Sequence, residues 1–141
     1  MQSSSFRTYI YLFAGFLAAS CFFGCKSDEE ANLDGFWKVM SVELPNKTSI
    51  AVDSQFYGFE RKYVFSLTRL VSANDAAISY GYVDYPEKGK VHIEMDKNHV
   101  GGDFATKSKW KNTEATFTIK TLSGNQLILE KGDTLFILKR H

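Results

Sequence analysis

Cysteine is scarce in this chain, and so are proline and net charge. Both cysteines, Cys21 and Cys25, lie near the N-terminus, and none follows them. A folded region without cysteine has no disulfide to stabilise it, no thiolate zinc site and no cysteine nucleophile. The formal net charge is only +1, from 17 basic and 16 acidic side chains. Because the chain is nearly neutral and has no basic block, we do not expect a nucleic-acid partner.

Long hydrophobic runs are also missing, apart from one at the N-terminus. Residues 8–24 carry no charge, and they follow a single basic residue, Arg7. A basic start followed by a short apolar run is typical of a secretory signal. A membrane-spanning helix needs about 20 apolar residues, whereas this run is shorter and ends in small residues. We therefore predict a lipoprotein signal peptide over residues 1–24, with an uncleaved membrane helix as the alternative.

Both cysteines lie where a lipid could be attached. Residues 17–21 and 22–25 each end at a cysteine, and each stretch resembles the lipobox of bacterial lipoproteins. Apolar character stops immediately before Cys25, and charged residues begin immediately after it. We therefore predict that Cys25 is the lipidated residue; the alternatives are Cys21 and an ordinary signal with a free cysteine. A lipidated cysteine with two or more acyl chains is held stably on a membrane, whereas one chain is held only marginally.

The segment after Cys25 is short and acidic. Residues 26–30 read Lys-Ser-Asp-Glu-Glu, which resembles the export tag of surface lipoproteins in some Gram-negative gut bacteria. This resemblance implies an outer-membrane lipoprotein that is exposed on the cell surface, with the membrane as its partner through the lipid. We expect residues 25–32 to form a flexible tether to a domain that begins at residue 33.

From residue 33 onward the pattern is that of β-strands. Apolar and polar side chains alternate in short runs, and no long stretch has a helical period. We expect strands at 36–44, one or two within 55–71, and then at 78–85, 90–95, 115–121, 126–130 and 134–139. A short helical turn is expected near 106–111. Turn residues separate most runs, so we predict about eight antiparallel strands in an up-and-down barrel or a sandwich.

Two stretches of this region resemble a known family. Residues 33–39, Leu-Asp-Gly-Phe-Trp-Lys-Val, are similar to the Gly-x-Trp opening of lipocalin-like barrels. Residues 135–140 resemble the last strand of lipocalin-like domains in small Bacteroides-type lipoproteins, mostly of unknown function. The resemblance implies one all-β domain over 33–141, an antiparallel barrel of about eight strands. It also implies that Trp37 and Arg140 meet where the barrel closes, with Lys139 as the alternative to Arg140, and it brings no catalytic residues.

Residues 96–103 are the densest group of oxygen-bearing side chains. Their start matches a calcium-binding EF-hand loop, but the last ligand position of such a loop would be Lys107 instead of glutamate. No expected element carries two histidines on one face, since the three are His92, His99 and His141. No serine lies in a nucleophile motif. We therefore predict no metal site, no cofactor and no enzymatic activity.

Aromatic side chains are the remaining functional signal. Tyr63, Phe65, Tyr80 and Tyr82 belong to the expected strands between residues 55 and 85. Because tyrosine offers both a ring and a hydroxyl, we expect these four to line a cavity for a small apolar or amphipathic ligand. The alternative is that they fill the barrel core. The leading hypothesis is a lipid-anchored, non-catalytic binding module; the alternative is a module that binds another envelope protein or a glycan through its loops.

Overall fold

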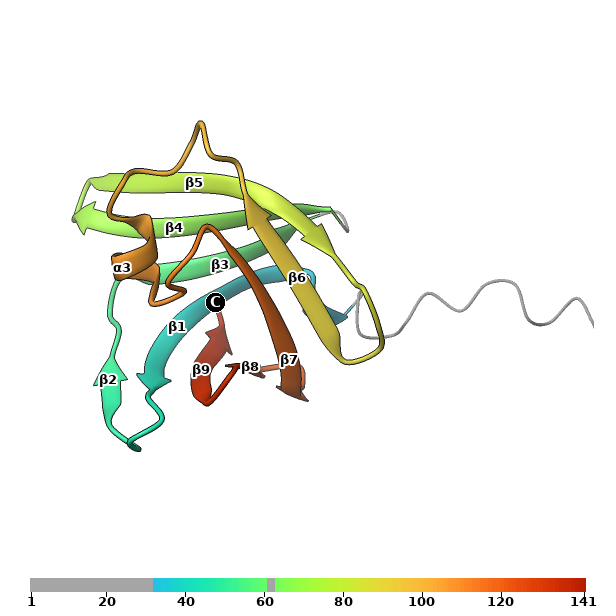
Figure 1. Ribbon diagram of the computed structural model, residues 1–141. Coiled ribbons are helices and arrows are strands. Elements are labelled where there is room, and N and C mark those ends of the chain that lie inside the picture. The colour runs from blue at the N-terminus through green and yellow to red at the C-terminus, as the bar shows by residue number, and fades with distance from the viewer. Residues whose placement is uncertain (1–31, 61–62) are drawn as a thin grey trace, which may run out of the picture.

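The computed structural model describes residues 32–60 and 63–141 (Figure 1). The elements within these residues are nine strands and a short helix. They are β1 (Gly35–Glu43), β2 (Ser49–Ala51), β3 (Gln55–Glu60), β4 (Val64–Ser72), β5 (Asp75–Asp84), β6 (Lys90–Met95), α3 (Phe104–Ser108), β7 (Glu114–Leu122), β8 (Gln126–Lys131) and β9 (Thr134–Arg140). The predicted signal peptide and Cys25 lie outside the described residues. Within the described residues, no helix has the length and apolar character to cross a membrane.

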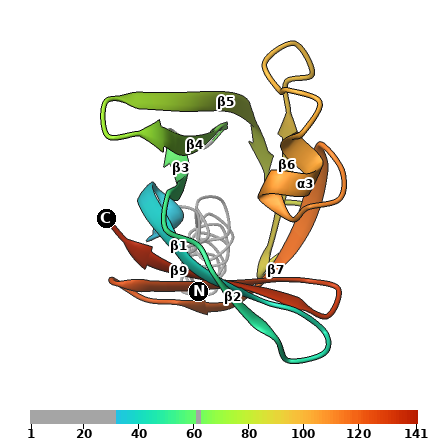
Figure 2. The same ribbon diagram turned by 90° about the vertical axis from the view of Figure 1, so that its left-hand side faces the viewer.

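Eight of the strands close into an antiparallel barrel. Neighbours pair in the order β1-β3-β4-β5-β6-β7-β8-β9, and β9 pairs back with β1. Strand β2 is a short addition that pairs with the second half of β1, whereas β3 pairs with the first half. Figure 2 shows this ring of strands along its axis. The predicted all-β, eight-stranded, up-and-down barrel is confirmed, and the sandwich alternative is wrong.

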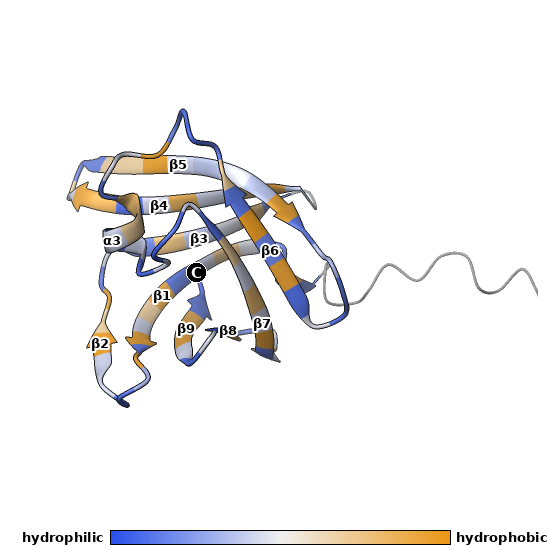
Figure 3. Ribbon diagram, viewed as in Figure 1, coloured by the Kyte–Doolittle hydropathy of each residue, from blue (hydrophilic) through white to orange (hydrophobic). Residues whose placement is uncertain are grey.

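The interior is filled because side chains alternate along each strand. Figure 3 shows apolar and polar bands alternating along β6, where Val91, Ile93 and Met95 are buried while His92 and Glu94 point the other way. The same period in the other strands produces one hydrophobic core inside the ring. Full burial of a valine, isoleucine or methionine side chain contributes about 1.5–3 kcal/mol to the free energy of folding, relative to leaving it exposed.

One end of the barrel, where β1 begins and β9 ends, is closed by Trp37 and Arg140. The two residues are opposite each other in the β1–β9 pairing. Trp37 is fully buried, and its Nε1 donates a hydrogen bond of 2.8 Å to the Leu33 carbonyl. The Arg140 guanidinium carbon lies 4.2 Å from the centroid of the Trp37 ring. This is the arrangement that the family resemblance implied, whereas Lys139 is exposed.

Arg140 also ties three loop carbonyls together at this closed end. Its guanidinium donates hydrogen bonds of 2.8–2.9 Å to the carbonyl oxygens of Asn32, Asp34 and Gly124. The guanidinium leaves no room for a side chain at Gly35, where a Cβ would lie 2.7 Å from the Arg140 Nη1. Gly35 also has a φ of +126°, a conformation that favours glycine. The backbone conformation therefore favours glycine at this position of the Gly-x-Trp motif, and a side chain there would also displace the guanidinium that covers the tryptophan.

Several local expectations need correction. The region 55–71, where one or two strands were expected, holds two: β3 ends at Glu60 and β4 begins at Val64. Gly58 lies inside β3, where a Cβ would come within 2.3 Å of the Ser66 hydroxyl oxygen and 2.9 Å of the Phe36 ring. The helical turn is at Phe104–Ser108, slightly earlier than predicted, and the short β2 was not expected.

Candidate functional site

The end of the barrel opposite Trp37 is surrounded by four connections. Residues 44–54 join β1 to β3 and include β2, and residues 73–74 join β4 to β5. Residues 96–113 join β6 to β7 and include α3, and residues 132–133 join β8 to β9. Figure 2 is seen from this open end, with α3 beside β6 and β7. A barrel of eight strands is just wide enough either to fill itself with side chains or to hold one small ligand. The side chains that these connections place in the opening therefore decide whether the barrel is filled or can hold a ligand.

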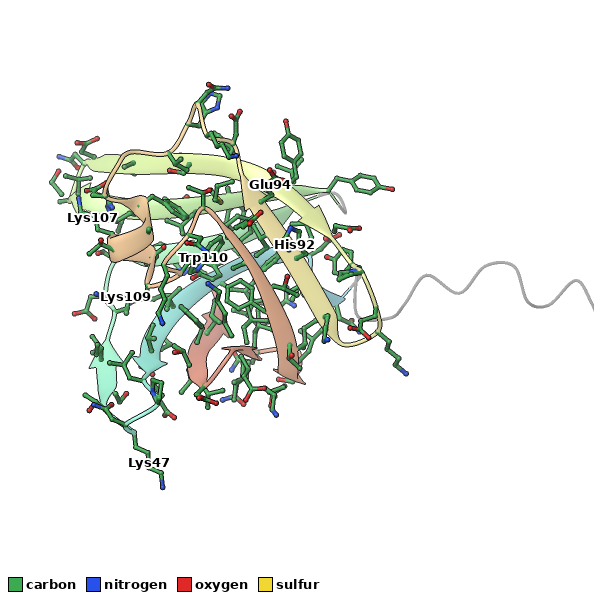
Figure 4. All side chains as sticks on the ribbon, viewed as in Figure 1. Lys47, His92, Glu94, Lys107, Lys109 and Trp110 are labelled. Carbon is green, nitrogen blue, oxygen red and sulfur yellow. The ribbon has the colours of Figure 1, made fainter. Side chains whose placement is uncertain are left out.

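Trp110 occupies the centre of the barrel, although it belongs to a connection and not to a strand (Figure 4). Its side chain is fully buried. Its ring centroid lies 5.3–5.8 Å from the centroids of four other rings, those of Tyr57, Phe65, Phe104 and Phe117. The Trp110 ring thus fills the space that a ligand would occupy in a hollow barrel.

Each polar group of Trp110 has a hydrogen-bond partner. The indole Nε1 donates to the Tyr57 hydroxyl oxygen at 2.7 Å, and the backbone N–H donates to the Ser108 hydroxyl at 3.2 Å. The Trp110 carbonyl accepts a hydrogen bond from the Lys131 ammonium. Burial raises the pKa of the Tyr57 hydroxyl, and the bond from Trp110 partly opposes this rise. Tyr57 therefore keeps its proton and stays neutral, because burial disfavours the charged form of its hydroxyl group.

The two residues that flank Trp110 both adopt a left-handed backbone conformation. Lys109, which ends α3, has a φ of 63°, and Lys111 has a φ of 72°. This conformation costs about 1–2 kcal/mol for a residue with a side chain. The two left-handed residues turn the chain so that the Trp110 ring points into the barrel, while the side chains of Lys109 and Lys111 stay exposed.

Two adjoining hollows lie at the open end. The first, of about 360 Å³, has Trp110, Phe136 and Pro45 among its apolar lining and Lys109, Lys111 and Lys131 among its polar lining. The second, of about 460 Å³, is lined in part by Leu44 and Ala105, and shares Pro45, Lys109 and Lys111 with the first. Both volumes fall in the range of small-molecule sites, about 300–1,000 Å³.

The first hollow carries an excess of positive charge. Three lysines are among the residues that line it, whereas Asp133 is the only acidic residue among them. Within residues 32–60 and 63–141, none of the three lysines forms an ion pair with a carboxylate. Partial burial lowers the pKa of the Lys131 ammonium, and the charge of Lys111 lowers it further. The site therefore combines an apolar floor with a positively charged rim.

Comparisons with known proteins support the assignment of a lipocalin-like barrel. The model of the lipocalin-like domain family matches residues 16–141. The chain belongs to the lipocalin-like domain family. A lipocalin-like protein from Bacteroides uniformis ATCC 8492 has a similar structure, with a TM-score of 0.70 and 26% identity, covering 78% of this chain and 99% of that one.

A second similar structure, an uncharacterized protein from Bacteroides eggerthii DSM 20697, has a TM-score of 0.67 and 20% identity. The match covers 77% of this chain and 99% of that one. At this identity, the likeness supports the shared fold alone. No curated protein matches the chain.

Three of the four aromatic residues predicted to line a cavity lie on the outside of this lipocalin-like domain. The exposed fractions of Tyr63, Tyr80 and Tyr82 are 62%, 47% and 64%, and only Phe65 points inside. The predicted alternation along β5 is correct, but the assigned face is wrong, because Gly81 and Val83 are the buried residues.

The reason for the reversed face is steric. A Cβ at Gly81 would lie 2.5 Å from the Glu94 carbonyl oxygen and 2.9 Å from the Met95 Cα, so no side chain fits there. The interior is already occupied by Phe65 and Trp110, whose centroids lie 5.6 Å apart. The larger tyrosines of β5 face solvent, where their hydroxyl groups can be hydrated.

The oxygen-rich loop at residues 96–103 uses its oxygens to hold its own turn. The Asp96 carboxylate accepts a hydrogen bond of 2.9 Å from the Asn98 backbone N–H, and its second oxygen lies 2.8 Å from the His99 Nδ1. His92 lies elsewhere, on β6, with its Nδ1 2.8 Å from the Thr116 hydroxyl. The part of the chain that the structure describes contains no group of three or more His, Cys, Asp or Glu side chains placed to hold a metal ion.

The open-end residues of this lipocalin-like domain are not marked by any motif of the sequence. Trp110, Lys111 and Lys131 lie outside the alternating strand pattern or at its edge. One signal was available: a tryptophan between two lysines in an irregular stretch has a large apolar ring that must be buried somewhere. The direction in which that ring points depends on the left-handed turns at Lys109 and Lys111, which no motif marks.

Proposed function

We propose that this protein is a lipid-anchored lipoprotein of the cell envelope whose barrel binds a small amphipathic ligand at its open end, without catalysis. The observation that carries the binding role is the first hollow, where Trp110 and Phe136 meet three lysines. Small-molecule sites typically combine apolar walls with a few well-placed polar groups. An apolar ligand group placed against this floor would gain about 25 cal/mol for each Å² removed from water.

The binding part of the proposal is testable because the chain has two tryptophans, one at each end of the barrel. The barrel and its core lie within residues 32–141, so a chain that starts at Lys26 retains them. In this chain, Trp37→Phe leaves Trp110 as the reporter of the open end, and Trp110→Phe leaves Trp37 as the matched control. An amphipathic ligand should change the emission of Trp110 and leave that of Trp37 unchanged.

Native mass spectrometry of the same chain, purified from its own host, provides an independent measurement. A retained small molecule supports the ligand-binding proposal. If no molecule is retained and no added amphipath changes the emission of Trp110, the proposal is wrong.

The lipid anchor is supported by the apolar run at residues 8–24 and by the change to charged residues directly after Cys25. The mass of the N-terminal peptide of the mature protein tests it. We expect a peptide that begins at an acylated Cys25. A peptide that begins at Cys21, or one without acyl groups, contradicts this part of the proposal.

Surface exposure on the outer membrane is supported by residues 26–30, which resemble an export tag. Protease added to intact cells should remove the domain. Replacing Asp28, Glu29 and Glu30 by alanine should protect it, because the protein would then stay inside the envelope. Equal digestion of the two forms would show that the acidic segment is not an export signal.

A second candidate function is favoured by the outer face of β4 and β5. Exposed apolar side chains lie there on paired strands, with Val64 opposite Tyr82, and exposed fractions of 38% and 64%. The same face includes Leu70, Ile78 and Tyr80. Exposed apolar patches often mark interaction sites. This observation favours a protein-interaction module, although the contact would be made by a strand face and not by the loops.

A photo-crosslinking residue at position 82 in intact cells tests this second function, with position 47 in the exposed β1–β2 turn as the control. Crosslinks to one defined envelope protein from position 82 alone would support it. Equal crosslinking from both positions would count against it.

A further inference from the structure

We infer that the ligand of the open end is an amphipathic anion, whose carboxylate or phosphate head group is held by Lys109, Lys111 and Lys131. This inference rests on the proposed binding function and adds the charge of the head group. The three lysines come from separate parts of the chain, two from the β6–β7 connection and one from the end of β8. The fold brings all three to the rim of the same hollow, above Trp110 and Phe136.

Some lysines of the described residues are paired with a carboxylate, whereas the three rim lysines are not. Lys107, two positions before Lys109, forms an ion pair with Asp103, and Lys90 and Lys120 pair with Glu87 and Glu130. No such pair is formed by the three rim lysines in the described part of the chain. Three positive charges against the single negative charge of Asp133 leave the hollow with a net charge that an anion would balance.

Lys131 is placed to contact both the protein and a ligand. Its ammonium donates one hydrogen bond to the Trp110 carbonyl and is partly buried. A lysine ammonium has three donors, so further donors remain for an anionic head group. The nearby charge of Lys111 makes the free site electrostatically unfavourable, and an anion between the two lysines would relieve this repulsion.

The side chains of Lys109 and Lys111 are free to contact a ligand. Their left-handed backbone directs the Trp110 ring into the barrel, while both side chains are exposed. In the described residues neither lysine forms an ion pair, so both charges are available to an anionic head group.

Three probes with the same ten-carbon chain test the inference on the chain that starts at Lys26: decanoate, decan-1-ol and decyltrimethylammonium, each below its micelle concentration. Binding is measured by Trp110 emission in the Trp37→Phe background and by calorimetry. We expect decanoate to bind about tenfold more tightly than decan-1-ol, as charge-assisted hydrogen bonds add to the apolar contact. The cation should bind most weakly. The affinity for decanoate should fall with added salt, because exposed charges are screened.

Substitutions of the rim lysines locate the head group. Lys131→Gln should weaken decanoate binding about tenfold, because Lys131 is the least exposed of the three. Lys109→Gln and Lys111→Gln should each weaken it about two- to fivefold, since both side chains are exposed. Lys111→Gly removes the charge while relaxing the backbone, and should weaken binding as much as Lys111→Gln. Lys109→Gln and Lys111→Gln should bind decan-1-ol as the parent does.

Lys139→Gln is the matched control, because it makes the same change in net charge at an exposed position near the closed end. It should leave both affinities unchanged. Decyl phosphate, compared with decanoate, then decides between the two head groups.

Two outcomes separate this inference from the proposed function. If decanoate and decan-1-ol bind equally and the lysine variants change neither affinity, the anionic head group is wrong while ligand binding stands. If none of the probes binds, the inference and the proposed function are both wrong. Weaker decanoate binding in Lys139→Gln, equal to that in Lys111→Gln, would show a general effect of net charge and would also overturn the rim site.

Discussion

The indole Nε1 of Trp110 donates a 2.7 Å hydrogen bond to the Tyr57 hydroxyl oxygen inside the barrel. Both side chains are fully buried, and they are 53 positions apart in the sequence. The bond joins the long β6–β7 connection to strand β3. It therefore holds the Trp110 ring in the middle of a barrel that would otherwise contain a cavity.

The losses of stability from removing the two partners of this bond should not add up. Tyr57→Phe leaves the Trp110 Nε1 buried without an acceptor, which costs about 1–3 kcal/mol. Trp110→Phe leaves the Tyr57 hydroxyl without its donor and also creates a cavity. In the double variant the loss should be smaller than the sum of the two, as expected for directly coupled residues. Urea unfolding of the four proteins measures this, and strictly additive losses would show that the bond does not couple the two residues.

Trp37 and Arg140 should stabilise the closed end together. Trp37→Ala should lower the free energy of unfolding by about 3–5 kcal/mol, because it empties a fully buried site. Arg140→Lys keeps the charge but loses the planar fork that contacts three carbonyls, and should cost about 1–3 kcal/mol. Lys139→Gln, beside Arg140 but exposed, should change stability by less than about 0.5 kcal/mol. An Arg140→Lys protein as stable as the parent would contradict this role of the guanidinium.

A side chain at Gly35 should destabilise the protein. Gly35→Ala places a Cβ at 2.7 Å from the Arg140 Nη1 on a backbone with a φ of +126°, so we expect a loss of more than about 1 kcal/mol. Gly102→Ala is the matched control, because nothing lies within 4 Å of a Cβ there. Combining Gly35→Ala with Arg140→Ala should remove the clash but keep the backbone strain. Thermal unfolding of these proteins separates the two causes; equal melting temperatures for Gly35→Ala and Gly102→Ala would exclude both.

The loop at Asp96 should respond to acid. Hydrogen bonds from the Asn98 backbone N–H and then from His99 hold the pKa of the Asp96 carboxyl below its ordinary value of 3.8. Because the folded-state pKa is the lower one, the contribution to stability is complete above about pH 4 and is lost as the pH falls through the folded pKa.

An NMR titration of the Asp96 carboxyl should show this lowered midpoint. His99→Ala should raise it only part of the way to 3.8, because the larger cause, the Asn98 bond, remains. A midpoint at or above 3.8 in the parent protein would show that the turn does not hold the carboxylate.

Alternation and sequence order predicted sequential antiparallel strands but left a barrel and a sandwich open. The resemblance to lipocalin-like barrels implied that the first and last strands meet, with Trp37 opposite Arg140, as the structure has them. The inward face of β5 was not predictable. Along that strand, apolar residues occur on both faces, as Tyr82 beside Val83 shows, and alternation by itself does not say which face is inside.

The amino-acid sequence determined the all-β class and the strand boundaries to within a few residues, because these follow from side-chain period and turn chemistry over short distances. The contact between Trp37 and Arg140 at the closed end was implied by the family resemblance of the sequence. The tertiary structure alone decided that Trp110 fills the barrel and that Lys109, Lys111 and Lys131 share one rim. Those positions depend on contacts between residues far apart in the chain, such as Trp110 with Tyr57. They also depend on two left-handed residues, Lys109 and Lys111, in a connection that has no periodic pattern. The residues around Trp110 in the sequence therefore do not indicate where its ring is buried.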